Sequence, residues 1–181
     1  GVYDATYFRP ACIQMVRFEK QEEDEDCLYL NVYSPSTVGK KPVMVFIHGG
    51  AFIGGSGSQY LYNGKNFCDK DIVVVSINYR LGVFSMLNFS FIDKEFASNL
   101  ALKDHLMAIK WVYENIEAFG GDPEDITICG QSAGAISVIC LLNVAEAKKY
   151  IKKAIAISPL PDLVNSKERS IQIAEGFLKY L

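Results

Sequence analysis

The stretch Ile126-Thr-Ile-Cys-Gly-Gln-Ser-Ala-Gly134 decides how the rest of the chain is expected to fold. Residues 126–129 form a β-branched run that predicts a short strand, and the apolar residues 135–142 favour a helix. A Gly-x-Ser-x-Gly turn joins them. A strand, a tight turn and a helix in this order predict a nucleophile elbow, in which a strained corner presents the hydroxyl of Ser132 above the sheet. The alternative is a turn that only packs against its neighbours and has no catalytic role.

The small residues around Ser132 follow from the geometry of such a corner. Gly130 and Gly134 are expected to pass so close to neighbouring backbone that neither position has room for a Cβ atom. The N–H group of Ala133 begins the next helix and faces an oxygen that becomes negative when Ser132 attacks a carbonyl. The turn therefore predicts Ser132 as a nucleophile and Ala133 as a donor to the oxyanion.

A second glycine-rich segment, His48-Gly-Gly-Ala-Phe52, follows the apolar run 43–47. Consecutive small residues let successive N–H groups point into one pocket, and such a pocket can hold a tetrahedral oxyanion. The alternative is a glycine-rich turn with no ligand. The neighbouring Gly54-Gly-Ser-Gly57 does not predict a phosphate loop, because no Gly-Lys-Ser/Thr closes it and no helix begins directly after a G-x-G-x-x-G pattern.

Apolar runs and helical periodicity alternate along the chain. Short apolar runs at residues 43–47 and 72–77 predict strands covered on both faces, and residues 126–129 and 154–157 predict two further strands. The other expected elements are a one-face-buried strand over 27–33, a loop with short helices over 83–98, an amphipathic helix over 100–117 that Gly120-Gly-Asp-Pro123 stops, and a final helix after residue 170. This alternation predicts a mainly parallel sheet, with reactive residues at the carboxyl ends of its strands.

Composition limits the class of protein. The chain has 181 residues, of which 50% are hydrophobic, so it can form one globular domain with a core. A net charge of −3 gives no reason to expect nucleic acid as a partner. No apolar run approaches the length of a membrane span, and no cluster of metal ligands is evident, so we expect neither a membrane span nor a metal or organic cofactor.

The start of the chain and its cysteines bear on processing. The first residue is Gly1 and no signal-peptide pattern follows, so the chain is expected to be a fragment or a processed piece. Five cysteines do not support a dense disulfide framework. Cys12 and Cys27 flank a polar stretch and could form one bridge, whereas the other three lie in or near apolar runs and are typical of small core residues.

Five segments resemble, in their order along the chain, signatures of the type-B carboxylesterase and cholinesterase family. They are Glu25-Asp-Cys-Leu-Tyr-Leu-Asn-Val-Tyr33, His48-Gly-Gly-Ala-Phe52, Asn78-Tyr-Arg-Leu-Gly82, Ala118-Phe-Gly-Gly-Asp-Pro123 and Gly130-Gln-Ser-Ala-Gly134. The resemblance implies an α/β-hydrolase fold, with a mostly parallel sheet flanked by helices. It implies that residues 1–181 are a partial catalytic domain without its C-terminal half. The implied reaction is hydrolysis of a small-molecule carboxylic ester through an acyl-enzyme on serine, with no cofactor.

The resemblance also assigns site residues. Ser132 matches the nucleophile that accepts the acyl group, and Gly50, Ala51 and Ala133 match three backbone donors of the oxyanion hole. The family more often has Gly where Ala51 stands and Glu where Gln131 stands. The methyl group of Ala51 narrows the space for the acyl group, and Gln131 removes a charge beside the nucleophile.

Two residue pairs and one modification complete the expectations. By resemblance, Cys12 and Cys27 match a disulfide that closes a small loop, and a disulfide favours a secreted or luminal protein. Arg80 and Asp104 match a structural salt bridge, which we expect to be buried. The triplet Asn88-Phe-Ser90 is a sequon and makes Asn88 a candidate for N-glycosylation.

The same resemblance shows what this chain lacks. In the family, an acid and then a histidine follow the serine far downstream, whereas the two histidines here, His48 and His105, both precede Ser132. We expect His48 to make a structural hydrogen bond in its loop and His105 to pack on a helix. The remainder of the domain is therefore expected to supply the acid and the base. We do not expect this chain alone to hydrolyse esters at a normal rate.

Two alternatives to an active esterase follow from the sequence. One is a catalytically silent cholinesterase-like adhesion or binding protein, although such relatives usually lose the nucleophile and Ser132 is present. The other is an inactive truncated esterase, because a partial sheet leaves hydrophobic edges and faces uncovered. No residue here names a particular ester.

Overall fold

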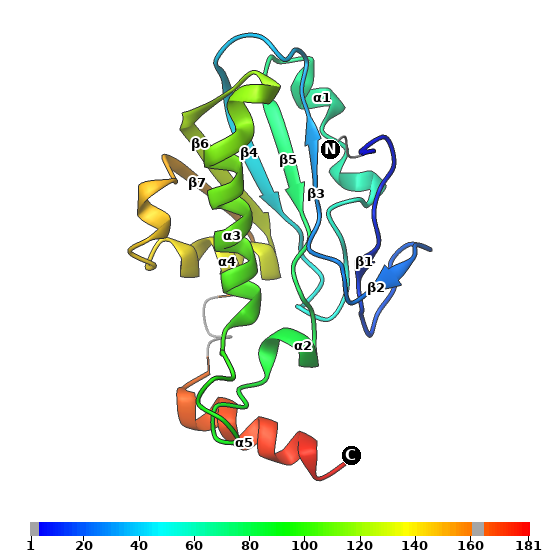
Figure 1. Cartoon of the computed structure of the whole chain (residues 1–181), viewed down its shortest axis with the longest axis vertical. Helices are drawn as coiled ribbons and strands as arrows, with labels where there is room; N and C mark the ends of the chain where they lie inside the picture. The colour runs from blue at the N-terminus through cyan, green and yellow to red at the C-terminus, as the bar shows by residue number, and fades with distance from the viewer. Residues whose placement is uncertain (1–3, 161–164) are drawn as a thin grey trace.

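The computed structural model describes residues 4–160 and 165–181. Its centre is a five-stranded sheet in the order β3-β5-β4-β6-β7 (Figure 1). The sheet is parallel except at β3, which runs antiparallel to β5. A mostly parallel sheet with helices between its strands is an α/β fold, as the alternating sequence pattern predicted.

The elements have the following bounds. The strands are β1 Ala11–Cys12, β2 Glu23–Asp24, β3 Leu30–Tyr33, β4 Lys41–Ile47, β5 Val73–Ile77, β6 Gly121–Gln131 and β7 Lys153–Ile157. The helices are α1 Lys65–Cys68, α2 Val83–Met86, α3 Leu100–Asn115, α4 Ala133–Leu141 and α5 Lys167–Leu178, with short 3₁₀ turns at η1 Tyr60–Tyr62, η2 Ile116–Phe119 and η3 Ala147–Lys149. In the described ranges, no helix is long and apolar enough to cross a membrane.

Helices α3 and α4 pack on one face of the sheet (Figure 1). Along β4, Val43, Val45 and Ile47 are fully buried, whereas Met44 and Phe46 between them keep partial exposure. Side chains alternate across a strand, so the three buried residues lie on one face of the sheet. The core therefore lies between this face and the two helices.

The apolar runs differ in how well they are covered. Strand β5 is buried at every position, as its continuous apolar run predicted. The apolar residues 154–157 form β7, as predicted, but they are all exposed, with 46% of the surface of Ile155 accessible. Among the described residues β7 pairs only with β6, so its outer edge has no neighbouring strand. An apolar strand with an open edge is what a partial sheet leaves uncovered.

The long helix ends earlier than its apolar period predicted. Helix α3 stops at Asn115 and continues as the 3₁₀ turn η2, and Gly120 then closes the turn with a φ of 76°. The next residue, Gly121, already pairs with Lys41, so β6 begins before the β-branched run at residue 126. The segment expected only to stop a helix therefore also starts the strand that leads to Ser132.

An ion pair ties the loop after β5 to α3. Arg80 Nε and Nη2 donate to Asp104 Oδ2 and Oδ1 at 2.9 and 2.5 Å, and the Arg80 backbone N–H donates to Oδ2 at 3.1 Å. The Asp104 side chain is 3% exposed, but that of Arg80 is 34% exposed. The expected salt bridge is present, but only its carboxylate is buried. The long side chain of Arg80 carries the guanidinium to the surface.

We expect Asp104→Ala to lower the free energy of unfolding by about 2 kcal/mol, because it removes a buried acceptor and leaves the Arg80 N–H unpaired. Glu114→Ala is the matched control on the same helix, since its pair with Lys110 spans 3.9 Å at the surface. Its effect should stay below about 0.5 kcal/mol. Urea unfolding followed by circular dichroism measures both, and equal losses would contradict the structural role of Asp104.

Candidate active site

Ser132 occupies a strained corner between β6 and α4. Its φ of 53° and ψ of −118° lie in a region that residues with side chains rarely adopt, at a cost of about 1–3 kcal/mol. The Ser132 N–H donates to Ile157 O at 2.9 Å, and Ser132 O accepts from Ile136 N at 3.0 Å. Strand β7 and the first turn of α4 therefore hold the corner from both sides. The helix begins at Ala133, directly after the serine, as expected.

The two glycines of the turn are required by close contacts with backbone. A Cβ atom on Gly130 would lie 2.3 Å from Gly134 O. One on Gly134 would lie 2.1 Å from Ile47 O and 2.8 Å from His48 O. Backbone cannot move aside as a flexible side chain can, so the absence of a Cβ at both positions is confirmed as a steric requirement.

The second glycine-rich segment, residues 48–52, forms a tight loop at the carboxyl end of β4. Gly50, Ala51 and Phe52 have φ values of 113°, 54° and 61°, and Gly50 O accepts from the N–H groups of Ile53 and Gly54 at 3.0 and 3.2 Å. Within the described residues, the N–H groups of Gly50, Ala51 and Ala133 have no hydrogen-bond acceptor. No acceptor in the described part of the chain therefore competes for these three N–H groups.

The 48–52 loop lies directly beside the serine corner. Strands β4 and β6 pair in parallel with Ile47 opposite Gly130, so both segments leave the same edge of the sheet. A Cβ atom on Gly49 would lie 3.3 Å from Ser132 Cβ and 2.4 Å from Gln131 Oε1. Ser132 and the 48–52 loop are thus in contact, and Gln131 packs its side chain against the loop.

The two histidines are buried below this region. His48 Nδ1 donates to Gly49 O at 2.7 Å, which is the structural bond expected of His48. His48 Nε2 and both ring nitrogens of His105 have no partner among the described residues. Burial lowers the pKa of His48 to about 4 and, together with the nearby His48, that of His105 to about 3. Both imidazoles are therefore neutral at pH 7.

No metal centre is indicated near these groups. In residues 4–160 and 165–181, no three His, Cys, Asp or Glu side chains gather closely enough to hold a metal ion.

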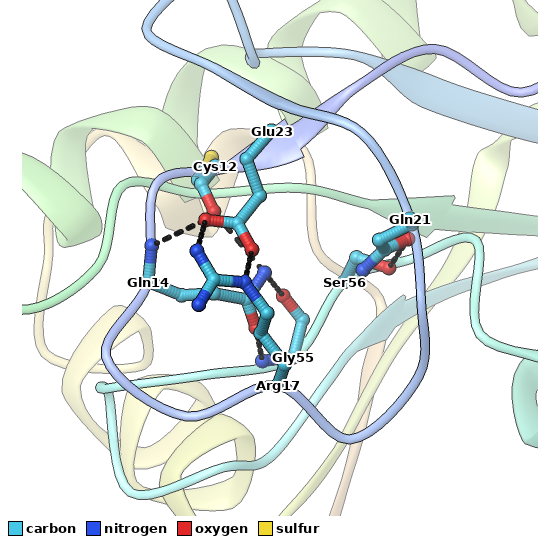
Figure 2. A network of polar contacts seen from close by, with 7 residues as sticks. All are labelled: Cys12, Gln14, Arg17, Gln21, Glu23, Gly55 and Ser56. Carbon is cyan, nitrogen blue, oxygen red and sulfur yellow. Dashed lines mark hydrogen bonds and ion pairs between the residues drawn. The ribbon is translucent and has the colours of Figure 1, made fainter.

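An N-terminal network braces the loop that follows residue 52 (Figure 2). Gln14 Oε1 accepts from Gly55 N at 2.8 Å, and Gln14 Nε2 donates to Cys12 O at 3.1 Å. Ser56 Oγ donates to Gln21 Oε1 at 3.0 Å. Sequence reasoning did not identify Gln14 as a loop anchor, because residues 1–20 show no periodicity and the contact spans 41 positions.

The same bonds exclude a phosphate loop at residues 54–57. The Gly55 N–H is held by Gln14, and the Gly57 N–H donates to Asn78 Oδ1 at 2.8 Å. A phosphate cradle needs these N–H groups to be free. The segment is therefore a supporting loop, as the missing Lys-Ser/Thr closure predicted.

The disulfide between Cys12 and Cys27 is present and confirms that pairing. It joins β1 to the segment before β3, and Asn78 Nδ2 donates to Cys27 O at 3.0 Å. The disulfide and the residues after β5 are therefore linked through Asn78.

The structure counts against the predicted glycan on Asn88. Asn88 is 6% exposed, its Nδ2 donates to Ser170 Oγ at 3.3 Å, and its Oδ1 accepts from Ser90 N at 3.1 Å. A glycan would replace a hydrogen on this buried nitrogen, for which the packing leaves no room. The sequon alone could not reveal this, because α5 provides the partner from 82 positions away.

Comparison with known proteins identifies the family. The model of the Carboxylesterase family matches residues 1–176. The chain belongs to the carboxylesterase family. It is 42% identical to the para-nitrobenzyl esterase of Bacillus subtilis over 99% of this chain and 38% of that protein. It is 48% identical to the juvenile hormone esterase of Tribolium castaneum over 82% of this chain and 26% of that protein.

Solved carboxylesterase structures share the fold. The carboxylesterase of Geobacillus stearothermophilus superposes with a TM-score of 0.92 at 44% identity, over 99% of this chain and 38% of that one. The juvenile hormone esterase of Manduca sexta, solved with OTFP covalently attached, gives a TM-score of 0.91 at 31% identity, over 98% of this chain and 35% of that one. The α/β-hydrolase fold is therefore confirmed, in partial form. The chain spans less than two fifths of the length of these relatives.

We expect Gly134→Ala to destabilise the carboxylesterase domain by about 2–4 kcal/mol, because the new methyl group overlaps the carbonyl of Ile47. Gly176→Ala in α5 is the matched control, since nothing lies within 4 Å of its added Cβ and alanine favours helix. Thermal unfolding measures both variants. An unchanged midpoint for Gly134→Ala would contradict the contact between the elbow and β4.

The buried histidines predict a loss of stability in acid. Folding lowers the pKa of both below the ordinary value of 6.5, so the unfolded chain binds more protons as the pH falls from about 6.5 towards about 3. Stability should therefore be fully present above pH 6.5 and decline below it. His105→Leu removes one of these groups and should make the decline shallower, as measured by urea unfolding between about pH 4 and 8. Parallel curves for the two proteins would contradict this.

Proposed function

We propose that the intact protein containing this chain hydrolyses carboxylic esters, with Ser132 as the nucleophile. The observation that carries the proposal is the placement of a strained serine beside a loop with unpaired N–H groups. Nucleophile and oxyanion donors in contact at one sheet edge are the arrangement that acyl transfer needs. Membership of the carboxylesterase family supports the same reaction.

The proposed reaction has two steps. The Ser132 oxygen bonds to the ester carbonyl carbon, and the carbonyl oxygen becomes negative. The N–H groups of Gly50, Ala51 and Ala133 donate to that oxygen, and each such donor typically contributes a few kcal/mol to lowering the barrier. The Ser132 hydroxyl proton passes through the general base to the alcohol, which leaves as its bond to the carbonyl carbon breaks. Water then attacks the acyl group, which releases the carboxylic acid and returns a proton to Ser132.

A general base must come from a residue other than His48 or His105. Both are buried and held neutral by desolvation, and the one ring hydrogen bond that either makes within the described chain joins His48 to Gly49. We infer that an acid and a histidine lie in the part of the domain that the relatives have beyond the portion matched here. The exposed β7 edge is consistent with further structure packing against this chain.

The substrate class is a small organic ester. The relatives include proteins named para-nitrobenzyl esterase, juvenile hormone esterase and bile salt-activated lipase. We infer that the methyl group of Ala51, on the 48–52 loop, narrows the space for the acyl group and favours acyl groups of modest width. The disulfide between Cys12 and Cys27 supports residence in an oxidising compartment. We therefore propose that the protein is secreted or luminal.

Covalent labelling tests the proposal. A fluorophosphonate probe should modify Ser132 in the intact protein, and Ser132→Ala should abolish both labelling and turnover of a small aryl ester. Ser137→Ala is the matched control on the same helix, since its hydroxyl already donates to Ala133 O at 3.2 Å, and it should keep both. Absence of labelling in the unmodified protein would overturn the proposal in favour of a silent binding protein.

The 181-residue chain by itself should behave differently from the intact protein. Without a base, the rate should fall to the residual level of about 10³–10⁴ over water that an oxyanion hole and binding supply. Stopped assays with the same aryl ester measure this. Turnover equal to that of the intact protein would show that the base lies within this chain, and lack of a cooperative unfolding transition would favour an unstable truncated esterase.

A further inference from the structure

Tyr79 lies against the 48–52 loop and connects it to the core. Tyr79 follows β5 and is 0% exposed. Its hydroxyl donates to His48 O at 2.9 Å, and its ring stacks on the His48 imidazole with centroids 4.3 Å apart and planes at 22°. On the other side, its ring meets His105 edge-on at 4.4 Å. Tyr79 is thus fixed between α3 and the loop.

These contacts control the direction of the Gly50 N–H. In a trans peptide the carbonyl of one residue and the N–H of the next lie in one plane. The Gly49 carbonyl accepts from His48 Nδ1 at 2.7 Å, so this bond sets the plane that contains the Gly50 N–H. Tyr79 holds the imidazole that makes the bond, by stacking on its ring.

The same tyrosine also fixes the preceding peptide. Its hydroxyl bond to His48 O sets the plane that contains the Gly49 N–H. His48 O lies 2.8 Å from where a Cβ on Gly134 would stand, so this carbonyl is held between the tyrosine and the serine helix. A shift of the His48 peptide would therefore disturb both the loop and the elbow.

We propose that Tyr79 is a positioning residue for the oxyanion donors, acting through His48. Tyr79 is fully buried and cannot touch a substrate, so its effect passes through the loop backbone. This inference rests on the proposed ester hydrolysis for its kinetic consequence, but the orientation of the Gly50 N–H is a property of the loop itself. A misaligned donor should weaken binding of the negative oxygen more than binding of the neutral ester.

The first test uses Tyr79→Phe in the intact protein, which keeps the ring and removes the hydroxyl. We expect kcat for a small aryl ester to fall about tenfold with KM changed less than about twofold, because the donors act in the transition state. Affinity for a trifluoromethyl ketone, which forms an oxyanion on the enzyme, should fall by the same factor as kcat/KM. Tyr79→Leu also removes the ring stack and should lower kcat further.

Ser76→Ala is the matched control. Ser76 is a fully buried residue of β5, and its hydroxyl donates to the Gly57 carbonyl at 2.6 Å. The variant removes an equivalent buried hydroxyl and should lower the melting temperature by a similar amount while keeping kcat within about twofold. Equal losses of kcat in Ser76→Ala and Tyr79→Phe would reduce Tyr79 to a general structural role and overturn the inference.

A second readout does not depend on activity. The amide NMR signal of Gly50 should move in Tyr79→Phe and stay in place in Ser76→Ala. Only the first variant releases the His48 peptide, which carries the imidazole that bonds to the Gly49 carbonyl. A Gly50 signal that is unchanged in Tyr79→Phe would overturn the inference even if the protein is an active esterase. A shifted signal in a protein that the fluorophosphonate probe does not label would support the positioning role and reject the proposed reaction.

Discussion

The contact between Gly134 and the carbonyl of Ile47 is the constraint on which the rest of the site depends. The Ile47 oxygen lies 2.1 Å from the place where a side chain on Gly134 would begin. This approach lets α4 start immediately after Ser132 and lets β4 and β6 end side by side. The 48–52 loop continues from the same carbonyl, so the serine corner and the loop share one anchoring peptide.

Support for that peptide comes from parts of the chain that are distant in sequence. Tyr79 reaches the next carbonyl, that of His48, from the end of β5, and Gln14 holds the following loop from the N-terminal segment. The ion pair of Arg80 with Asp104 fixes the residue after Tyr79 to α3. The strain at Ser132 is kept in place because each flanking segment is bonded to a different element.

Local rules predicted the features that depend on short-range sterics. The elbow glycines, the strand and helix around Ser132, and the failure of residues 54–57 to form a phosphate loop all follow from residues within a few positions of one another. The disulfide required the family resemblance, since spacing alone left that pairing open. Features set by long-range packing were not predictable: Asn88 bonds to Ser170 of α5, and Gln14 bonds to Gly55.

The central claim is that Ser132 and the N–H groups of Gly50, Ala51 and Ala133 face one pocket built for acyl transfer. A crystal structure of the intact protein inactivated by a small organophosphate tests it most directly. The account predicts phosphorus bonded to Ser132 Oγ and a phosphoryl oxygen about 3 Å from those three nitrogens. Phosphorus on another residue, or a phosphoryl oxygen turned away from the 48–52 loop, would contradict it.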